Sequence, residues 1–286
     1  MHHDHPQKLE PALYVVATPI GNLRDITLRA MEVLAAADVV AAEDTRNTAH
    51  LLSHHAIRAK QLVAVHQHNE RGAANKIIAL LQAGQSVAFV SDAGTPAVSD
   101  PGALLVQAVL AAGLRVIPIP GASAVVAALS AAGLNDAHFL FYGFLPNKSA
   151  ARRAALQTLQ DHPCTLVFYE APHRIVECVA DLLAVLGGER QIVLARELTK
   201  LFETIHSCLL GDAETWLMSD SNQQRGEFVV LVSGAPPQQG LSRETERVLK
   251  LLLAELPLKQ AVQLATQISG EGRNELYQLA LQLKQA

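Results

Sequence analysis

Short apolar segments alternate with helical segments along most of this chain, and this alternation restricts the fold more than any other feature. The runs ALYVVA, DVVAAE, SVAFV and LRVIPIP have the length and composition of buried strands, and the segments between them show helical spacing. The same pattern resumes with the runs CTLVFYE, QIVLARE, ETIHSCLL and EFVVLVS. Alternating strands and helices favour an α/β fold with an open, mostly parallel sheet.

The length of 286 residues suggests two domains and a small appendage. The segment APPQQGLS has the composition of a linker, and the sequence after it is helical except at Pro257 and at 270–272. That spacing suits a helix-turn-helix unit. We therefore divide the chain into a flexible tail (1–12), two α/β domains (13–122 and 123–234), a linker (235–242) and a helical appendage (243–286).

Composition excludes several classes of protein. A net charge of −4 argues against a protein that coats nucleic acid without specificity, although a local basic groove remains compatible with it. The three cysteines have no metal-binding spacing and indicate reduced thiols in a cytoplasmic protein, and we expect no metal site. The polar start of the chain does not resemble a secretory signal. The uncharged run VIPIPGASAVVAALSAAGLN contains Pro and Gly in its first third, so it predicts a strand, a turn and a buried helix rather than a membrane span.

The predicted strands end in unusually polar and constrained loops. These loops read TPIGN, AEDTR, SDAGTP, PIPGAS, YGFLPNK and YEAPHR. In open parallel sheets, ligands bind beyond the carboxyl ends of the strands, and Gly and Pro can direct backbone groups toward a ligand. Neither a G-x-G-x-x-G motif after the first strand nor a P-loop motif is present, which disfavours an ordinary dinucleotide or P-loop site. Together the loops predict a ligand cleft.

Several motifs carry a resemblance to a known family. They are ATPIGNLRDITLRA, AAEDTR, SDAGTPAVSDPG, PIPGASA, YGFLP, FYEAPHR and ARELTKLFE. From about Leu13 to the C-terminus, the chain resembles the bacterial ribosomal RNA small-subunit methyltransferase I family, in the tetrapyrrole-methylase-like group of S-adenosylmethionine enzymes. The resemblance implies two α/β domains with S-adenosylmethionine in the cleft between them, a homodimer, and methylation of a cytidine 2′-hydroxyl in small-subunit (16S) ribosomal RNA.

The resemblance also implies a set of cofactor-binding residues. They are Pro19, Ile20, Gly21, Asp92, Thr95, Ser123, Ala124 and Tyr169. In the porphyrin-modifying relatives the third loop typically reads Gly-Asp-Pro, whereas here it reads Asp-Ala-Gly-Thr-Pro. This departure favours the RNA-modifying branch.

Methylation of a ribose hydroxyl needs alignment of the reacting atoms and removal of one proton. Glu43, Asp44 and Glu170 stand at strand ends and are the candidate bases. Each of them could equally be a structural partner of an arginine, and the sequence does not choose among them.

Basic residues near the predicted cleft and in the tail are the candidate RNA contacts. They are Arg46, Lys148, Arg152, Arg153, Arg174, Arg196, Lys200, Lys259 and Arg273. For Arg152 and Arg153 the alternative is a solvated helix face, and the whole C-terminal segment could be a packing appendage. The expected partner is small-subunit ribosomal RNA or the assembled small subunit, with no membrane partner. Two other functions stay open, namely a tetrapyrrole carbon methyltransferase and a noncatalytic ribosome-assembly binder.

Overall fold

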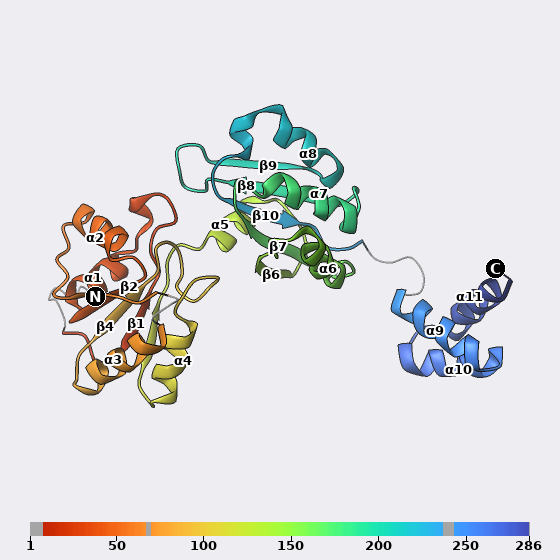
Figure 1. Ribbon diagram of the computed structural model, residues 1–286, viewed down its shortest axis with the longest axis horizontal. Helices are drawn as coiled ribbons and strands as arrows, with labels where there is room; N and C mark the ends of the chain where they lie inside the picture. Colours follow the sequence, from red (N-terminus) through yellow and green to blue (C-terminus); the bar gives the residue numbers. More distant parts are fainter. Residues whose placement is uncertain (1–7, 67–69, 237–242, 286) are drawn as a thin grey trace. The chain divides into compact units, whose positions relative to one another are not determined.

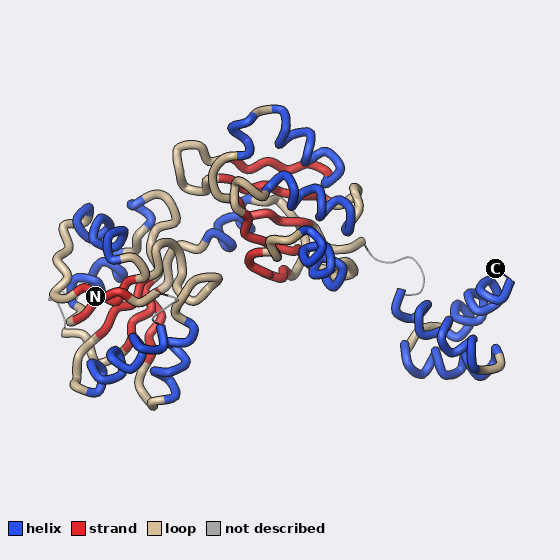
Figure 2. The backbone as a smooth tube through the Cα atoms, viewed as in Figure 1, coloured by secondary structure: helices blue, strands red, loops and turns tan. Residues whose placement is uncertain are grey.

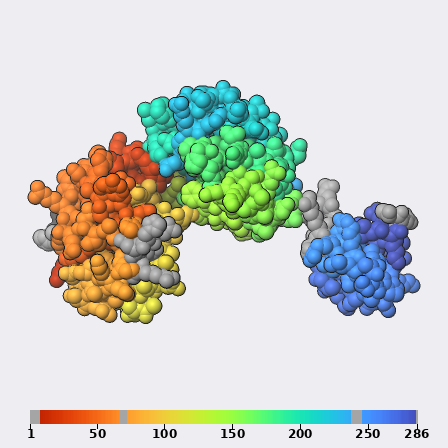
Figure 3. Space-filling view, in the orientation of Figure 1, coloured from red at the N-terminus to blue at the C-terminus, as the bar shows by residue number. Residues whose placement is uncertain are grey.

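The structure, a computed structural model, describes residues 8–66, 70–236 and 243–285. Its contacts divide the chain into two units, Met1–Gly234 and Ala235–Ala286, and the second unit forms a packed body of its own (Figures 1 and 3). Most of the predicted tail, residues 1–7, and most of the predicted linker, residues 237–242, lie outside the described residues.

The first sheet is entirely parallel, as the strand–helix alternation predicts. Its strands are β1 (Leu13–Val16), β2 (Val39–Ala42), β3 (Leu62–Ala64), β4 (Val87–Val90) and β5 (Val116–Ile119). They lie in the order β3-β2-β4-β1-β5. Every residue of β2 and β4 is buried, because helices cover both faces of the sheet and leave no side of these strands in water.

Two pairs of helices cover the two faces of this sheet (Figure 2). The helices of this part are a short 3₁₀ turn, η1 (Leu23–Asp25), and α1 (Leu28–Ala36), α2 (Thr45–His54), α3 (Glu70–Gln82) and α4 (Ala103–Ala111). Leu34 of α1 packs with Val90 in one cluster that also includes α2, and Ile77 of α3 packs with Phe89 in a second cluster that includes α4. The carboxyl ends of the parallel strands are left free for the loops that the sequence singled out.

The second sheet is mixed. Its strands are β6 (Phe139–Phe144), β7 (Thr165–Glu170), β8 (Gln191–Arg196), β9 (Thr204–Leu209) and β10 (Phe228–Val232). The order is β6-β7-β10-β8-β9, and only β6 and β7 are parallel. The expectation of a mostly parallel sheet is therefore wrong for this half. β8 runs into β9 through a short loop, and a hairpin connection of that kind joins antiparallel strands.

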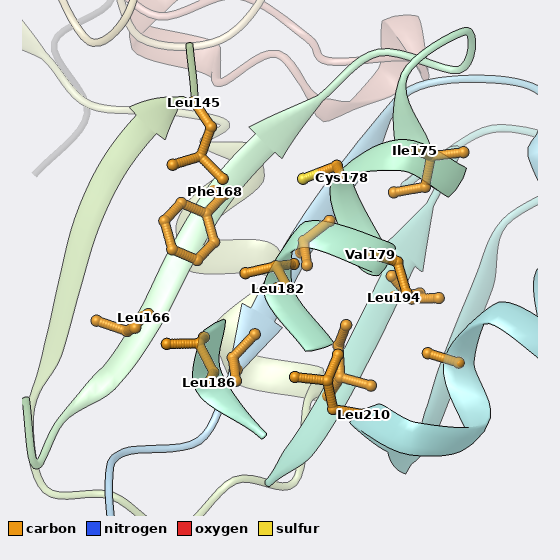
Figure 4. Packing of buried hydrophobic residues seen from close by; sticks show 14 of the residues in the cluster. Leu145, Leu166, Phe168, Ile175, Cys178, Val179, Leu182, Leu186, Leu194 and Leu210 are labelled. Atoms are coloured by element: carbon orange, nitrogen blue, oxygen red, sulfur yellow. The ribbon is translucent and has the colours of Figure 1, made fainter. Parts of the chain in front are cut away.

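Four helices and a 3₁₀ turn, η2 (Ser221–Gln224), accompany this sheet. The helices are α5 (Ala124–Ala131), α6 (Ser149–Leu159), α7 (Ile175–Leu186) and α8 (Leu210–Ser219). Phe168 of β7 packs with Cys178 and Leu182 of α7 on one face (Figure 4), whereas its neighbour Val167 packs with Ala128 of α5 on the other. Side chains along β7 thus alternate between the α7 face and the α5 face.

The uncharged run that begins at Val116 forms β5, a loop and α5, as expected. Among the described residues, no helix is long and apolar enough to cross a membrane.

The C-terminal unit is a bundle of three helices. They are α9 (Arg243–Glu255), α10 (Leu258–Ser269) and α11 (Arg273–Gln285). Leu249, Val262 and Leu276, one from each helix, share the core. The helices break at Pro257 and after Ser269, which are the breaks that the sequence predicts.

Candidate functional site

A pocket of about 370 Å³ lies in the first unit, among loops of both sheets. The first sheet and the start of α5 contribute Ile20 after β1, Ala93, Gly94, Thr95, Val98 and Asp100 after β4, and Ser123 and Ala124. The second sheet contributes Phe144 of β6, residues 169–173 at the end of β7, Ala195, Glu197, Leu198 and Lys200 around the end of β8, and residues 227–229 at the start of β10. The volume lies in the range of roughly 300–1,000 Å³ that is typical of sites for small organic ligands.

Five of the eight predicted cofactor residues line this pocket: Ile20, Thr95, Ser123, Ala124 and Tyr169. Pro19, Gly21 and Asp92 are not part of its lining. Backbone hydrogen bonds in both directions join Thr18 to Gly94 at 2.9 and 3.0 Å, and the Thr95 hydroxyl donates to the carbonyl oxygen of Ala122 at 3.1 Å. The loops after β1, β4 and β5 are therefore tied into one wall.

Unusual backbone angles concentrate in two loops of the pocket. Among the described residues, five non-glycine residues have positive φ, and four of them lie in these loops. They are Ala97 (67°) and Ser99 (62°) after β4, and Glu197 (51°) and Thr199 (65°) after β8. Such angles cost of order 1–3 kcal/mol each and persist where surrounding contacts fix the backbone. The second of these loops contains neither Gly nor Pro, so its composition gave no indication of an unusual backbone.

Acidic residues gather at the carboxyl ends of β2 and β4. The backbone N–H of Asp44 donates to Oδ1 of Asp92 at 3.1 Å, and the backbone N–H of Asp92 donates to Oε2 of Glu43 at 3.3 Å. Burial raises the pKa of Glu43, whereas hydrogen bonds from Arg46 lower the pKa of Asp44 to about 2. Asp44 is therefore a poor proton acceptor, and neither Glu43 nor Asp44 lines the pocket. No group of His, Cys, Asp or Glu side chains in the described ranges is arranged to hold a metal ion.

Glu170, the third candidate base, directs its carboxylate away from the pocket. The alternation along β7 places Tyr169 on the α5 face and Glu170 on the α7 face, where the carboxylate influences Cys178. The Glu170 side chain is fully buried and pairs with Arg174 at 3.1 Å. This geometry contradicts the hypothesis of a base at Glu170 and supports the structural role that the sequence left open.

Asp100 is a pocket residue that sequence reasoning missed. It lies in the strained loop after β4 and lines the pocket. Burial and the nearby carboxylate of Glu43 raise the pKa of Asp100 to about 6, and Asp92 contributes in the same direction. The one available signal was the second Ser-Asp pair of SDAGTPAVSDPG, because two such pairs are more than an ordinary turn needs.

Five of the predicted RNA contacts are exposed: Arg46, Lys148, Arg153, Lys259 and Arg273. Lys200 lines the pocket and forms ion pairs with Glu197 at 2.8 Å and Glu227 at 2.7 Å. These six positions are compatible with contact to a polyanion and stay predictions.

Burial contradicts three other predicted RNA contacts. The side chain of Arg152 is fully buried in an ion pair with Asp181 at 2.7 Å. Arg174 donates to the carbonyl oxygen of Leu145 at 2.7 Å, in addition to its pairing with Glu170. Arg196 is buried and donates to the carbonyl oxygen of Asn222 and to the hydroxyl of Thr204. These guanidinium groups hold the second sheet to its helices and loops and are not free to bind phosphate.

A parallel sheet joined to a mixed sheet, with a pocket among their loops, defines an α/β fold of the methylase type. The chain belongs to the family of tetrapyrrole (corrin/porphyrin) methylases, whose model matches residues 12–214. A second model, the RsmI C-terminal HTH domain, matches residues 239–284 and confirms the helix-turn-helix expectation.

Full-length relatives share about half of their residues with this chain. It is 56% identical to the ribosomal RNA small subunit methyltransferase I of Pseudomonas aeruginosa, over 94% of this chain and 96% of the relative. The protein of the same name from Escherichia coli O157:H7 is 50% identical over 98% of both chains.

Solved structures of tetrapyrrole-modifying enzymes share the fold. The methyltransferase CobJ superimposes with a TM-score of 0.60 at 23% identity, covering 78% of this chain and 94% of CobJ. A uroporphyrin-III-C-methyltransferase from Thermus thermophilus gives 0.55 at 22% identity, covering 79% and 95%. At this level of identity the similarity concerns the fold alone.

Proposed function

We propose that this protein transfers a methyl group from S-adenosylmethionine to the 2′-hydroxyl of a cytidine in small-subunit (16S) ribosomal RNA. The observation that carries the proposal is the identity of 50–56%, over nearly the whole chain, to relatives named ribosomal RNA small subunit methyltransferase I. The resemblance of the strand-end motifs to that family supplies the 2′-hydroxyl of cytidine as the acceptor.

The pocket fits the proposed methyl donor in size and in chemistry. Ile20, Val98, Phe144 and Val229 offer apolar walls for the adenosine part and for the carbon chain of the methionine part. Ser123 precedes α5 without a side-chain cap, so backbone N–H groups at this helix start are available for the carboxylate of the methionine part. The donor, when bound, supplies an activated methyl group on a sulfonium centre.

The protein's own residues must align the acceptor and exclude water. Alignment of reacting groups contributes about 7–11 kcal/mol in favourable cases. The hydrogen-bonded loops after β1, β4 and β5 supply a rigid wall for this purpose, and the loop after β8 also contributes to the lining.

The proposal also covers the division into domains, the contacts with RNA, the oligomeric state and the location of the protein. Residues 13–122 and 123–234 act as two α/β domains around the donor, which is supported by the two sheets, and residues 243–286 form a separate helical domain. Arg46, Lys148, Arg153, Lys200, Lys259 and Arg273 contact the RNA or the assembled small subunit. A homodimer is supported by the family resemblance and by the strongly exposed apolar side chains of Leu201 and Phe202. A ribosomal substrate implies a cytoplasmic location.

The proposed function is tested by transfer of a tritium-labelled methyl group. Purified small subunits, naked 16S RNA and uroporphyrinogen are offered separately as acceptors. We expect label in the RNA of at least one ribosomal acceptor and none in the tetrapyrrole. Label in the tetrapyrrole alone would favour the carbon-methyltransferase alternative that the shared fold raises. Absence of donor binding in calorimetry would favour a noncatalytic binder.

A further inference from the structure

The pocket contains one carboxylate that no cation neutralises. Four acidic residues contribute to its lining: Asp100, Glu170, Glu197 and Glu227. The Glu170 carboxylate is on the opposite face of the second sheet, and Lys200 pairs with both Glu197 and Glu227. Among the described residues, no Lys, Arg or His forms an ion pair with Asp100. An ion pair stabilises the charged form of a carboxylate and makes it a weaker proton acceptor, so Asp100 is the carboxylate of the lining best able to accept a proton.

The surroundings of Asp100 favour proton uptake near neutral pH. The groups that face it are Glu43 at the end of β2, Asp92 and Ser91 at the end of β4, and Tyr169 of β7. The other charged or titratable groups of the lining are His173, Glu197, Lys200 and Glu227. Burial and repulsion from Glu43 and Asp92 raise the pKa of Asp100 to about 6. A general base works best when its pKa lies near the working pH.

The loop that holds Asp100 is fixed from two sides. Ala97 and Ser99 have positive φ, and the backbone N–H of Ala97 donates to the carbonyl oxygen of Pro101 at 3.2 Å. On the other side, a Cβ atom at Gly143 would lie 2.8 Å from Oγ of Ser99, so the irregularity in β6 at this glycine accommodates the loop. A strained segment held in this way positions a side chain with little freedom, as a proton-transfer group requires.

We propose that the carboxylate of Asp100 is the general base of the reaction, on the evidence of its place in the pocket lining and its lack of a cationic partner. This inference rests on the proposed function. The O–H bond of the ribose 2′-hydroxyl breaks, and its proton moves to Asp100. The oxygen forms a bond to the methyl carbon as the carbon–sulfur bond breaks, and that electron pair stays on the sulfur. Asp100 then releases the proton to water.

The test compares the wild-type protein with Asp100→Asn and with Asp100→Glu at saturating donor and RNA. We expect Asp100→Asn to lower kcat by about 10²- to 10⁴-fold, with unchanged affinity for S-adenosylmethionine in calorimetry. The wild-type kcat should fall below a pH near 6, and the Asn variant should lose this dependence. Asp100→Glu should recover part of the rate. Asp212→Asn on the exposed start of α8 is the matched control and should behave as wild type.

A second readout needs neither donor nor RNA. The carboxyl carbon of Asp100, assigned by its absence in the Asn variant, should titrate near pH 6 in NMR spectra of the protein alone. A kcat within threefold of wild type in a folded Asp100→Asn variant, or a titration near pH 4, would overturn the assignment while the proposed function stands. Lost donor affinity with an unchanged kcat would overturn it as well, because Asp100 would then hold the donor. No methyl transfer to RNA by the wild-type protein would overturn the proposed function and this inference together.

Discussion

Gly21 lies so close to Lys200 that a Cβ atom at position 21 would be 2.5 Å from Cγ of Lys200. The same atom would be 3.0 Å from the backbone carbonyl oxygen of Leu198. The backbone of the loop after β1 therefore lies against side chains and a backbone carbonyl group of the loop after β8, although the two loops belong to different sheets. Only glycine leaves room for this contact, which joins two segments of the pocket lining.

Substitution of Gly21 by Ala should separate these two loops. Because the backbone of Leu198 cannot move aside as a flexible side chain would, we expect a loss of about 1–3 kcal/mol in the free energy of unfolding and weaker donor binding. Gly72→Ala is the control, since no atom lies within 4 Å of its added Cβ in α3 and the helix should gain up to about 1 kcal/mol. Urea unfolding and calorimetry measure both effects. Full donor affinity in Gly21→Ala would mean that this contact does not shape the binding site.

Asp100 should lower the stability of the protein at neutral pH. Its pKa of about 6 in the folded state exceeds the ordinary value of 3.8, so the folded state binds the proton more tightly than the unfolded state does. The stability that this proton supplies is complete below about pH 4 and is lost as the pH rises through about 6. The difference corresponds to at most about 3 kcal/mol, and to about half of that after solvent screening.

The Asp100→Asn variant makes this pH dependence measurable. Its melting temperature should exceed that of the wild type at pH 8, and the gain should shrink toward zero at pH 4.5. An equal gain at both pH values would mean that the effect comes from packing rather than from the charge.

The variants Arg152→Ala and Arg153→Ala should differ clearly in their free energies of unfolding. Arg152→Ala removes a fully buried guanidinium group from the carboxylate of Asp181, which keeps Arg153 as a partner, and should cost about 3 kcal/mol in urea unfolding. Half of the Arg153 side chain is exposed, so Arg153→Ala should cost about 1 kcal/mol or less. If Arg153 contacts phosphate, its loss should also reduce the slope of log affinity against log salt by about 0.7–0.9. Similar stability of the two variants would refute the structural role of Arg152.

Removal of the C-terminal unit should weaken binding of RNA and leave binding of the methyl donor unchanged. Every residue of the pocket lining precedes Gly234, where the contacts divide the chain. A chain that ends at Pro236 should therefore bind S-adenosylmethionine as the full chain does, while its KM for RNA rises. Lys259→Glu combined with Arg273→Glu should reproduce the rise if charge is the cause. A collapse of donor affinity in the truncated chain would show that the tail belongs to the donor-binding part.

The sequence predicts β1, β2, β4 and β5 because each is a continuous apolar run, and β2 and β4 are buried throughout. It did not predict β3, a three-residue strand whose side chains are at least partly exposed. It did not predict α2, because the segment TRNTAHLLSH is polar at every position except Ala49, Leu51 and Leu52. It also did not predict the antiparallel pairing of β8 and β9, since an apolar run carries no information about strand direction.

Some features of the candidate site could be predicted from short stretches of sequence, whereas others depend on contacts between residues far apart along the chain. Loops rich in Gly and Pro marked the pocket wall after β4, and Thr95 and Ser123 do line the pocket. Charge alone could not distinguish Arg152 from Arg153, because both pair with Asp181, 29 and 28 residues away along the chain, and they differ only in burial. The raised pKa of Asp100 likewise depends on Glu43, which another strand brings near.

The proposed acceptor of the methyl group is the ribose 2′-oxygen of a cytidine. The most direct measurement is mass spectrometry of nucleosides from small-subunit RNA after reaction with the purified protein and isotopically labelled S-adenosylmethionine. We expect labelled 2′-O-methylcytidine, and its loss when the Asp100→Asn variant replaces the wild type. Label on a base carbon or nitrogen, or label only in another nucleoside, would contradict this expectation.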